Sequence, residues 1–205
     1  MRKRETRERI LDAAARLLRE RGFDAVGVAA VMDRAGLTHG GFYAHFASKG
    51  DLLRDAFSGA ARTARARYFG GLGERRGAAW VRGAIQRYLS RSHRDDPGGG
   101  CPYPALGSDT GRRGADVRRV MDEELRESAR GFAANLAEAG VAQPSERALA
   151  LLALCAGGVA LARAVHDAKL SDHILTACRD LAMESLPAPA ATDRAVRRPA
   201  GKDTE

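Results

Sequence analysis

The sequence predicts an all-α protein, because apolar residues recur at helical spacing along most of the chain and no long segment alternates with a period of two. A second observation supports this fold class, since glycine, proline and capping residues separate the periodic segments. The segments that carry the helical spacing are 10–18, 28–35, 52–60, 80–89 and 117–136.

The ends of several helices can be predicted from single residues. Gly22 should end the first helix, and Pro144 suits the first turn of a later one. Ser48 precedes Asp51 by three residues, which is the capping-box spacing, so a helix should begin there. Ser171 is predicted to cap the last helix. The glycine- and proline-rich segment 93–104 is predicted to be a loop, and the tail from 187 to 205 to be disordered.

The charge distribution favours a polyanionic partner at the N-terminal end. The chain has 205 residues with 34 Lys and Arg against 26 Asp and Glu, and its pI is near 10.0. The basic surplus lies within residues 1–111, whereas residues 112–205 carry equal numbers of both signs. Three cysteines without paired spacing predict neither a disulfide framework nor a zinc site. The longest uncharged apolar run is too short to span a bilayer, so we expect a cytoplasmic protein with no membrane partner.

Residues 28–46 have the pattern of a helix-turn-helix. A helix over 28–35, a turn at Gly36-Leu37 and a second helix over 38–46 would place the second helix in a DNA major groove. Thr38 should cap that helix and lie near a phosphate. Gly40 and Gly41 each cost a helix about 1 kcal/mol relative to alanine, which close approach of the backbone to DNA would explain.

The side chains of this segment divide into an inner and an outer set. Phe42 and Phe46, four residues apart, are expected in the core. Tyr43 and His45 lie off that face and favour phosphate contact over idle surface positions, while His39 is the best candidate for a base contact. The six-residue spacing of the two histidines does not fit a metal site. Lys49 is also predicted to contact a phosphate. The basic N-terminal arm with Arg4 is either a solvated terminus or a DNA contact, and phosphate contact is the preferred interpretation.

The same segment resembles the N-terminal domain of the tetracycline-repressor-like (TetR) family of transcriptional regulators. The resemblance covers about fifty residues and rests on Gly22-Phe23, Gly36-Leu37-Thr38, Gly40-Gly41-Phe42-Tyr43, His45-Phe46, Ser48-Lys49 and Leu52-Leu53. It implies about nine helices, with a three-helix head over 1–47 and a ligand-binding and dimerisation bundle over 48–186. It also implies that positions Thr38, His39, Gly41, Tyr43, His45 and Lys49 face DNA. Gly27 departs from the family, which often has a threonine there, although glycine is an acceptable N-cap.

A dimer face is predicted in residues 144–186. Residues 148–162 carry no charge, and a helix that is apolar all round needs partners on more than one side. The alternative is that this segment forms only the core of its own subunit. The pair Gly157-Gly158 would let another helix approach closely. The residues predicted at the interface are Leu152, Cys155, Val159, Ile174, Cys178 and Leu181.

The body between head and interface contains isolated aromatic residues that could line an effector site. Aromatic residues at helical spacing also build cores, so both interpretations stay open. The candidates for the pocket are Phe57, Trp80, Tyr88, Cys101, Tyr103, Met121 and Phe132. Cys101 follows three glycines and could open a helix whose dipole favours the thiolate, as expected of an electrophile sensor. A half-buried residue at the end of a loop is the favoured alternative.

The sequence therefore predicts a homodimeric DNA-binding regulator, most simply a repressor that a small molecule or an electrophile releases from a near-palindromic operator. No catalytic arrangement, metal-ligand spacing or phosphate loop can be identified, so no enzyme activity and no cofactor are expected. The alternative is a helical module that binds nucleic acid without ligand control.

Overall fold

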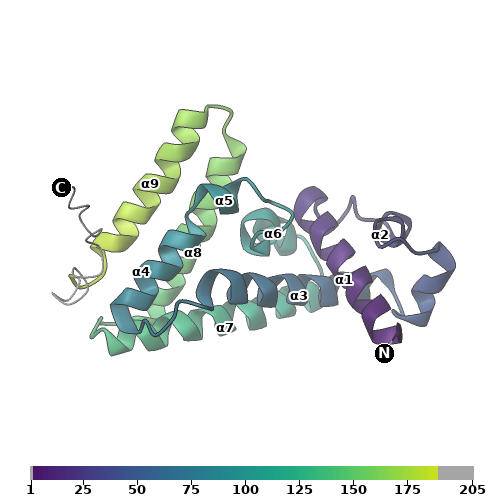
Figure 1. Ribbon diagram of the computed structural model, residues 1–205, viewed down its shortest axis with the longest axis horizontal. Coiled ribbons are helices and arrows are strands. Elements are labelled where there is room, and N and C mark those ends of the chain that lie inside the picture. The colour runs from purple at the N-terminus through teal and green to yellow at the C-terminus, as the bar shows by residue number, and fades with distance from the viewer. Residues whose placement is uncertain (1, 189–205) are drawn as a thin grey trace, which may run out of the picture.

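The computed structural model describes residues 2–188, and within this range every regular element is helical, as predicted. The three-helix head lies at one end of an elongated molecule and the hairpin of the last two helices lies at the other (Figure 1). The predicted tail lies outside the described residues from 189 onward. The elements are α1 (Arg2–Arg21), α2 (Val28–Arg34), the 3₁₀ helix η1 (His39–Ala44), α3 (Lys49–Phe69), α4 (Gly77–Tyr88), α5 (Arg91–Arg94), α6 (Pro102–Gly111), α7 (Ala115–Glu138), α8 (Pro144–Ala164) and α9 (Ala168–Glu184).

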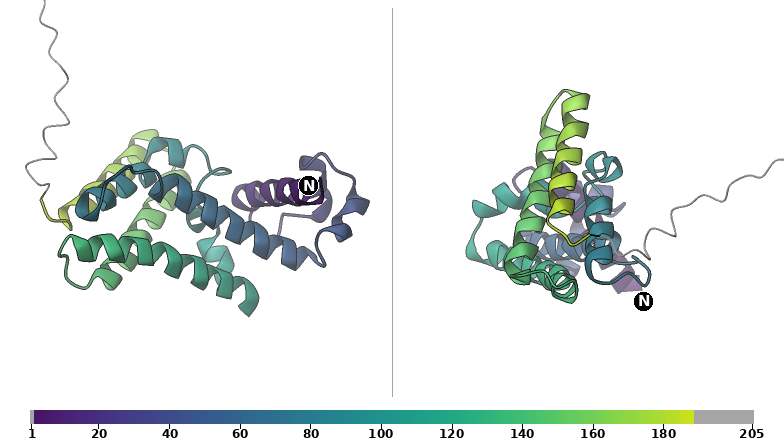
Figure 2. Two further views of the ribbon diagram at one scale, coloured as in Figure 1. Left: turned by 60° about the horizontal axis from the view of Figure 1, so that its bottom comes forward. Right: turned by 90° about the vertical axis from the view of Figure 1, so that its left-hand side faces the viewer.

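Two hydrophobic cores hold these helices together, and α3 belongs to both. Its first half contributes Leu52 and Phe57 to the core of the head, which also includes buried residues of α1, α2 and η1. Its second half contributes Tyr68 and Phe69 to the core of the body, together with residues of α4, α7, α8 and α9. The left view in Figure 2 shows α3 running from the head into the body. The predicted division of the chain after residue 47 stays a prediction. The first half of α3, which begins at Lys49, packs in the same core as the head.

Most predicted helix ends agree with the structure. Gly22 follows α1 with a φ of 76°, which is the left-handed conformation that glycine adopts without a steric cost. Pro144 is the first residue of α8. The Ser48 hydroxyl accepts a hydrogen bond from the Asp51 N–H (3.0 Å) and donates one to the Asp51 carboxylate (2.7 Å). The predicted loop over 93–104 is shorter than expected, since α5 ends at Arg94 and α6 begins at Pro102.

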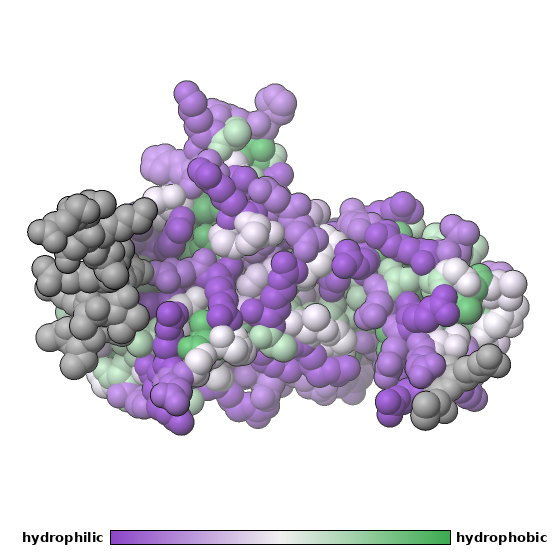
Figure 3. All heavy atoms as spheres, viewed as in Figure 1, coloured by the Kyte–Doolittle hydropathy of each residue, from purple (hydrophilic) through white to green (hydrophobic). Residues whose placement is uncertain are grey.

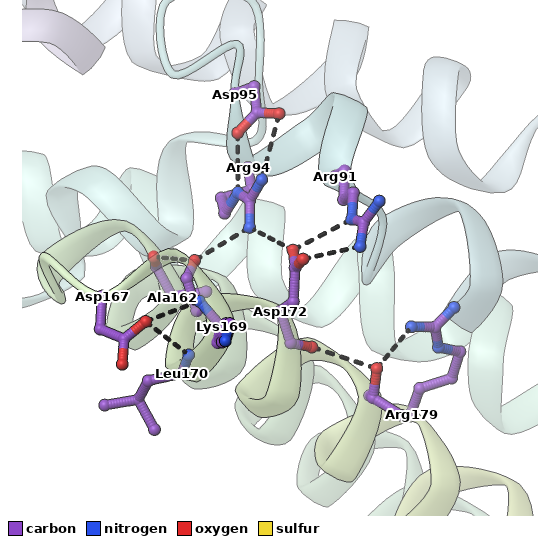
Figure 4. A network of polar contacts seen from close by, with 11 residues as sticks. Arg91, Arg94, Asp95, Ala162, Asp167, Lys169, Leu170, Asp172 and Arg179 are labelled. Atoms are coloured by element: carbon purple, nitrogen blue, oxygen red, sulfur yellow. Dashed lines mark hydrogen bonds and ion pairs between the residues drawn. The ribbon is translucent and has the colours of Figure 1, made fainter.

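The prediction that Ser171 caps the last helix is wrong. Asp167 caps α9 by accepting a hydrogen bond from the Lys169 N–H (2.8 Å), which places Ser171 within the first turns. The buried Ser171 hydroxyl instead donates to the Ala162 carbonyl of α8 (2.6 Å). The neighbouring Asp172 accepts from Arg91 (2.6 Å) and Arg94 (2.7 Å), so these polar contacts tie α5 to α9 (Figure 4).

Candidate nucleic-acid interface

The turn between α2 and η1 is built as a helix-turn-helix requires. Gly36 has a φ of 66°, and the Leu37 N–H donates to the Met32 carbonyl (2.9 Å), so the chain turns sharply after α2. The second helix differs from the prediction of an α-helix over 38–46, because residues 39–44 form a single 3₁₀ helix. Thr38 occupies the N-cap position, but its hydroxyl makes no capping hydrogen bond. That hydroxyl is therefore available to an external acceptor.

One face of η1 is anchored in the core of the head, as predicted. Phe42 is fully buried and Phe46 is 4% exposed, and their rings stack with centroids 5.8 Å apart. Tyr43 packs edge-on against Phe42 but leaves 72% of its surface exposed. The residues that the structure leaves exposed on the outer side include Thr38, His39, Gly40, Tyr43 and Lys49. This segment therefore has a fixed inner face and a polar outer face.

The two glycines of η1 differ in what surrounds them. A Cβ atom added to Gly41 would lie 3.7 Å from the Met32 side chain, which is ordinary contact. A Cβ atom added to Gly40 would meet no atom within 4 Å. Packing within the subunit thus gives no reason for a glycine at position 40. The explanation given from the sequence, close approach of the backbone to DNA, stays a prediction.

Three other predicted contact residues have distinct surroundings. His45 is half-buried, and its Nδ1 is buried without a hydrogen-bond partner among the described residues. Lys49 is the exposed first residue of α3, next to the free N–H groups of that helix. Arg4 is exposed near the start of α1, where its guanidinium lies 3.5 Å from the Glu8 carboxylate. Arg4 is thus on the head but makes an exposed ion pair of its own.

Side chains of α1 brace the helix-turn-helix from behind. Arg9 donates to the Ala35 carbonyl at the end of α2 (2.6 Å), and Arg7 forms an ion pair with Asp55 of α3. Near the other end of α1, Glu20 accepts two hydrogen bonds from Arg34 of α2 (2.6 and 3.0 Å). These contacts fix α2 and α3 relative to α1, so η1 is held in one orientation.

The sequence of this head matches a known protein family. The sequence of residues 10–56 matches the family model described as bacterial regulatory proteins of the tetR family. A TetR transcriptional regulator from Chloroflexus aurantiacus has the same fold with a TM-score of 0.76 and 26% sequence identity, over 91% of this chain and 98% of that protein. Residues 10–56 therefore match the DNA-binding domain of the TetR family, and the whole chain has the fold of TetR-family regulators. The match and the shared fold support a DNA-binding regulator, in agreement with the prediction that the chain is not an enzyme.

Two more distant TetR-family structures share the fold. Escherichia coli NemR in its reduced form has a TM-score of 0.77 and 21% identity, over 91% of this chain and all of that protein. A TetR-family regulator from Streptomyces coelicolor has a TM-score of 0.71 and 22% identity, over 89% of this chain and 90% of that protein. No curated protein matches the sequence.

The candidates for the effector pocket do not form one site. Phe57 and Met121 lie at the head core, where Phe57 stacks on Phe23 with centroids 6.4 Å apart. Phe132 is fully buried in the body core, where its ring makes edge contacts with Phe69 (5.0 Å) and Trp80 (5.2 Å). Tyr103 contacts both cores. Most of these aromatic side chains therefore fill cores, and Trp80 also borders an open groove, with Phe69 and Ser128.

Cys101 opens a helix, as predicted, but its thiol is not activated. It is the N-cap of α6 and only 3% exposed, and burial raises its pKa to about 11. Its N–H donates to Nε2 of the fully buried His93 (3.0 Å), whose Nδ1 in turn donates to the Tyr88 carbonyl (2.7 Å). The expectation that the helix dipole favours the thiolate is thus wrong here, because desolvation outweighs it. The alternative of a buried residue at the end of the loop fits the structure.

Three of the residues predicted at the dimer interface face the core of their own subunit. Leu152, Cys155 and Val159 are at most 4% exposed and pack in the body core, because this side of α8 faces the subunit's own helices. Ile174 and Cys178 are half-buried against the same core. Leu181 is 58% exposed and remains a candidate.

The sequence prediction did not name three further leucines that the structure leaves exposed on the last two helices. Leu149 and Leu161 of α8 and Leu170 of α9 are 48%, 59% and 47% exposed. Figure 3 shows apolar side chains exposed on the protruding α8–α9 hairpin. Gly157 lies on this outer side with nothing within 4 Å of an added Cβ, whereas a Cβ at Gly158 would come 2.9 Å from the Cys178 sulfur. Gly158 thus admits α9, and Gly157 lies on a surface open to a further helix.

Helix α8 is long and apolar enough to cross a membrane by length and composition alone. Its inner side instead belongs to the core of a helical bundle, as in a core helix of a soluble protein.

Proposed function

We propose that this chain is a cytoplasmic, homodimeric repressor that binds a near-palindromic operator through two copies of the segment 38–49 and leaves it when an effector binds. The observation that carries the proposal is the outer face of η1 and the start of α3. There an unbonded Thr38 hydroxyl, a sterically unneeded Gly40 and an exposed Lys49 lie together on a rigidly braced head.

The DNA-binding role follows from the chemistry of that face. The exposed hydroxyls of Thr38 and Tyr43 and the ammonium of Lys49 can donate to phosphate oxygens, and the N-terminus of α3 adds free N–H groups. His39 is exposed at the first position of η1 and is the proposed base contact. Phosphate contacts alone carry no sequence information, so specificity requires two heads at a fixed separation.

The dimer follows from the exposed apolar stripe on α8 and α9. Leu149, Leu161, Leu170 and Leu181 lie on the outer side of the hairpin, and the exposed small residues between them include Ala153 and Gly157. Two copies of this hairpin would form a four-helix interface with a twofold axis. Covering this stripe would remove an apolar surface that soluble monomers rarely expose.

The DNA contact can be tested through the salt dependence of operator binding. Selection from random duplexes supplies the operator, and footprinting should show a compact protected region with twofold symmetry. Each lost phosphate contact reduces the slope of log K against log salt by about 0.9, so Lys49→Ala in both subunits should make the slope shallower by about 1.8. Arg126→Ala removes a charge from the exposed face of α7 and should leave the slope unchanged. An unchanged slope for Lys49→Ala would show that Lys49 does not contact a phosphate.

The dimer can be tested by placing a charge in the stripe. Leu181→Asp should convert the protein from a dimer to a monomer in light-scattering measurements and should abolish cooperative binding to the two half-sites. Ala134→Asp, at an exposed position of α7, is the matched control and should remain dimeric. A dimer that survives both Leu181→Asp and Leu161→Asp would contradict the proposed interface.

The alternative of a nucleic-acid-binding module without ligand control predicts protection that grows with duplex length and shows no sequence preference. An electrophile signal at Cys101 is the less favoured form of the effector, because the thiol is buried with a raised pKa.

A further inference from the structure

A groove of about 460 Å³ lies between α1 and α3, outside the DNA-facing surface and the hairpin of α8 and α9. In the left view of Figure 2, α1 lies next to the head end of α3, and the two helices contact each other. The two helices run in the same direction, since Arg7 pairs with Asp55 near one end, while at the other Arg19 and Arg67 hold the same loop. The groove therefore has a head end and a body end.

The chemistry of the groove changes along its length. Its middle is lined by Leu11, Ala15, Ala56, Gly59 and Ala60, which offer no charge. Its body end is lined by Arg16, Arg19 and Arg67 and closes against Gly99. An apolar trough that ends in guanidinium groups matches an amphipathic anion.

The body end carries more positive charge than its neighbours neutralise. Arg67 bonds to the Asp96 carboxylate (3.1 Å) and the Gly99 carbonyl (3.0 Å), and Arg19 donates to the Gly98 carbonyl (2.6 Å). Arg16 forms no ion pair with any described residue, and burial followed by the charge of Arg16 lowers the pKa of Arg19. An anion placed between Arg16 and Arg19 would relieve this repulsion.

The distribution of acidic side chains along the groove also favours an anion at this end. Glu8 lies at the head end and pairs with Arg4, and Asp12 lies beside the apolar middle, one turn before Arg16. The guanidinium groups of the body end therefore outnumber the carboxylates that line the groove beside them.

We propose that this groove binds a small carboxylate with an apolar tail, with the carboxylate between Arg16 and Arg19 and the tail along Leu11 and Gly59. The loop at Gly98 and Gly99 joins α5 to α6 and is held by one arginine of the head helix and one of α3. A carboxylate that competes for these arginines would loosen the head from the body. This regulatory consequence rests on the proposed function, but the binding site does not.

Calorimetric titration of the DNA-free protein with octanoate tests the site, with 1-octanol as the uncharged control and acetate as the control without a tail. We expect saturable binding of octanoate and at least tenfold weaker binding of both controls. Arg16→Gln should weaken octanoate binding about tenfold, because a charge-assisted contact is lost. Arg126→Gln, on α7, should leave it unchanged.

A second variant blocks the tail without touching the charges. A Cβ at Gly59 would meet only the end of Arg62, at 4.0 Å, so Gly59→Leu should fold and fill the trough. It should abolish octanoate binding while the melting temperature stays the same or rises. Equal binding to the wild type, Arg16→Gln and Gly59→Leu, or equal binding of octanol and octanoate, would overturn the proposal. Because no DNA is present, a failure of operator binding would not affect this result.

Discussion

His93 should make the protein markedly less stable in mild acid. Its ring is fully buried, with Nδ1–H donating to the Tyr88 carbonyl and Nε2 accepting from the Cys101 N–H, so protonation would break the second bond and place a charge near Arg163 and Arg67. Burial, the largest cause, lowers the pKa of His93 from 6.5 to about 4. The neutral ring therefore stabilises the fold fully above pH 6.5, and this contribution is lost as the pH falls toward 4. A separation of about 2.5 pKa units corresponds to about 3 kcal/mol.

The assay is urea unfolding of the wild type and His93→Ala at one protein concentration, from about pH 7 to about pH 4.5. The variant should be less stable at pH 7, because two buried hydrogen bonds are lost. The difference in unfolding free energy between the two proteins should then shrink by about 2.5 kcal/mol as the pH falls, since only the wild type contains a buried imidazole whose protonation destabilises the fold. Aspartates with lowered pKa values are common to both proteins and cancel in the comparison. A difference that stays constant across this range would refute the reasoning.

Three other predictions concern helix ends, helix packing and thiol reactivity. Ser48→Ala should lower the free energy of unfolding by about 1 kcal/mol in urea titrations, because the Asp51 N–H loses its cap; no loss would mean that water replaces the hydroxyl. Gly158→Ala should destabilise the fold by about 1–3 kcal/mol, because α9 must move away from the added Cβ, whereas Gly157→Ala should leave the melting temperature the same or raise it; equal thermal shifts would contradict this assignment of faces. Iodoacetamide near pH 8 should modify the half-buried Cys178 before Cys101, as judged by mass spectrometry; the opposite order would restore Cys101 as a reactive thiol.

The fold class and the head could be predicted because their signals are local. The left-handed backbone of the turn favours glycine at position 36, Phe42 and Phe46 repeat at helical spacing, and the serine at position 48 precedes its carboxylate partner by three residues. Each of these features is determined by neighbours in the sequence. The 3₁₀ form of residues 39–44 was not predicted, because spacing over six residues does not distinguish it from an α-helix.

The faces of the body helices could not be predicted for a different reason. Helix α8 is apolar on all sides, so its composition does not reveal which side faces its own subunit. Val159 and Leu161 are equally plausible from the sequence, yet one is fully buried and the other is 59% exposed. Likewise, burial of Cys101 depends on His93 and on helices distant in the chain, which no local pattern specifies.

The participation of α3 in two cores limits how this regulator can be re-engineered. A chimaera joined after residue 47 would take Phe42 and Phe46 from one protein and the residues at positions 52 and 57 from another. In this chain Leu52 and Phe57 pack with the two phenylalanines in one core. Transplanting the specificity of this protein onto another scaffold therefore requires a junction beyond Ala60, so that the donor supplies the first three turns of the shared helix along with the reading segment.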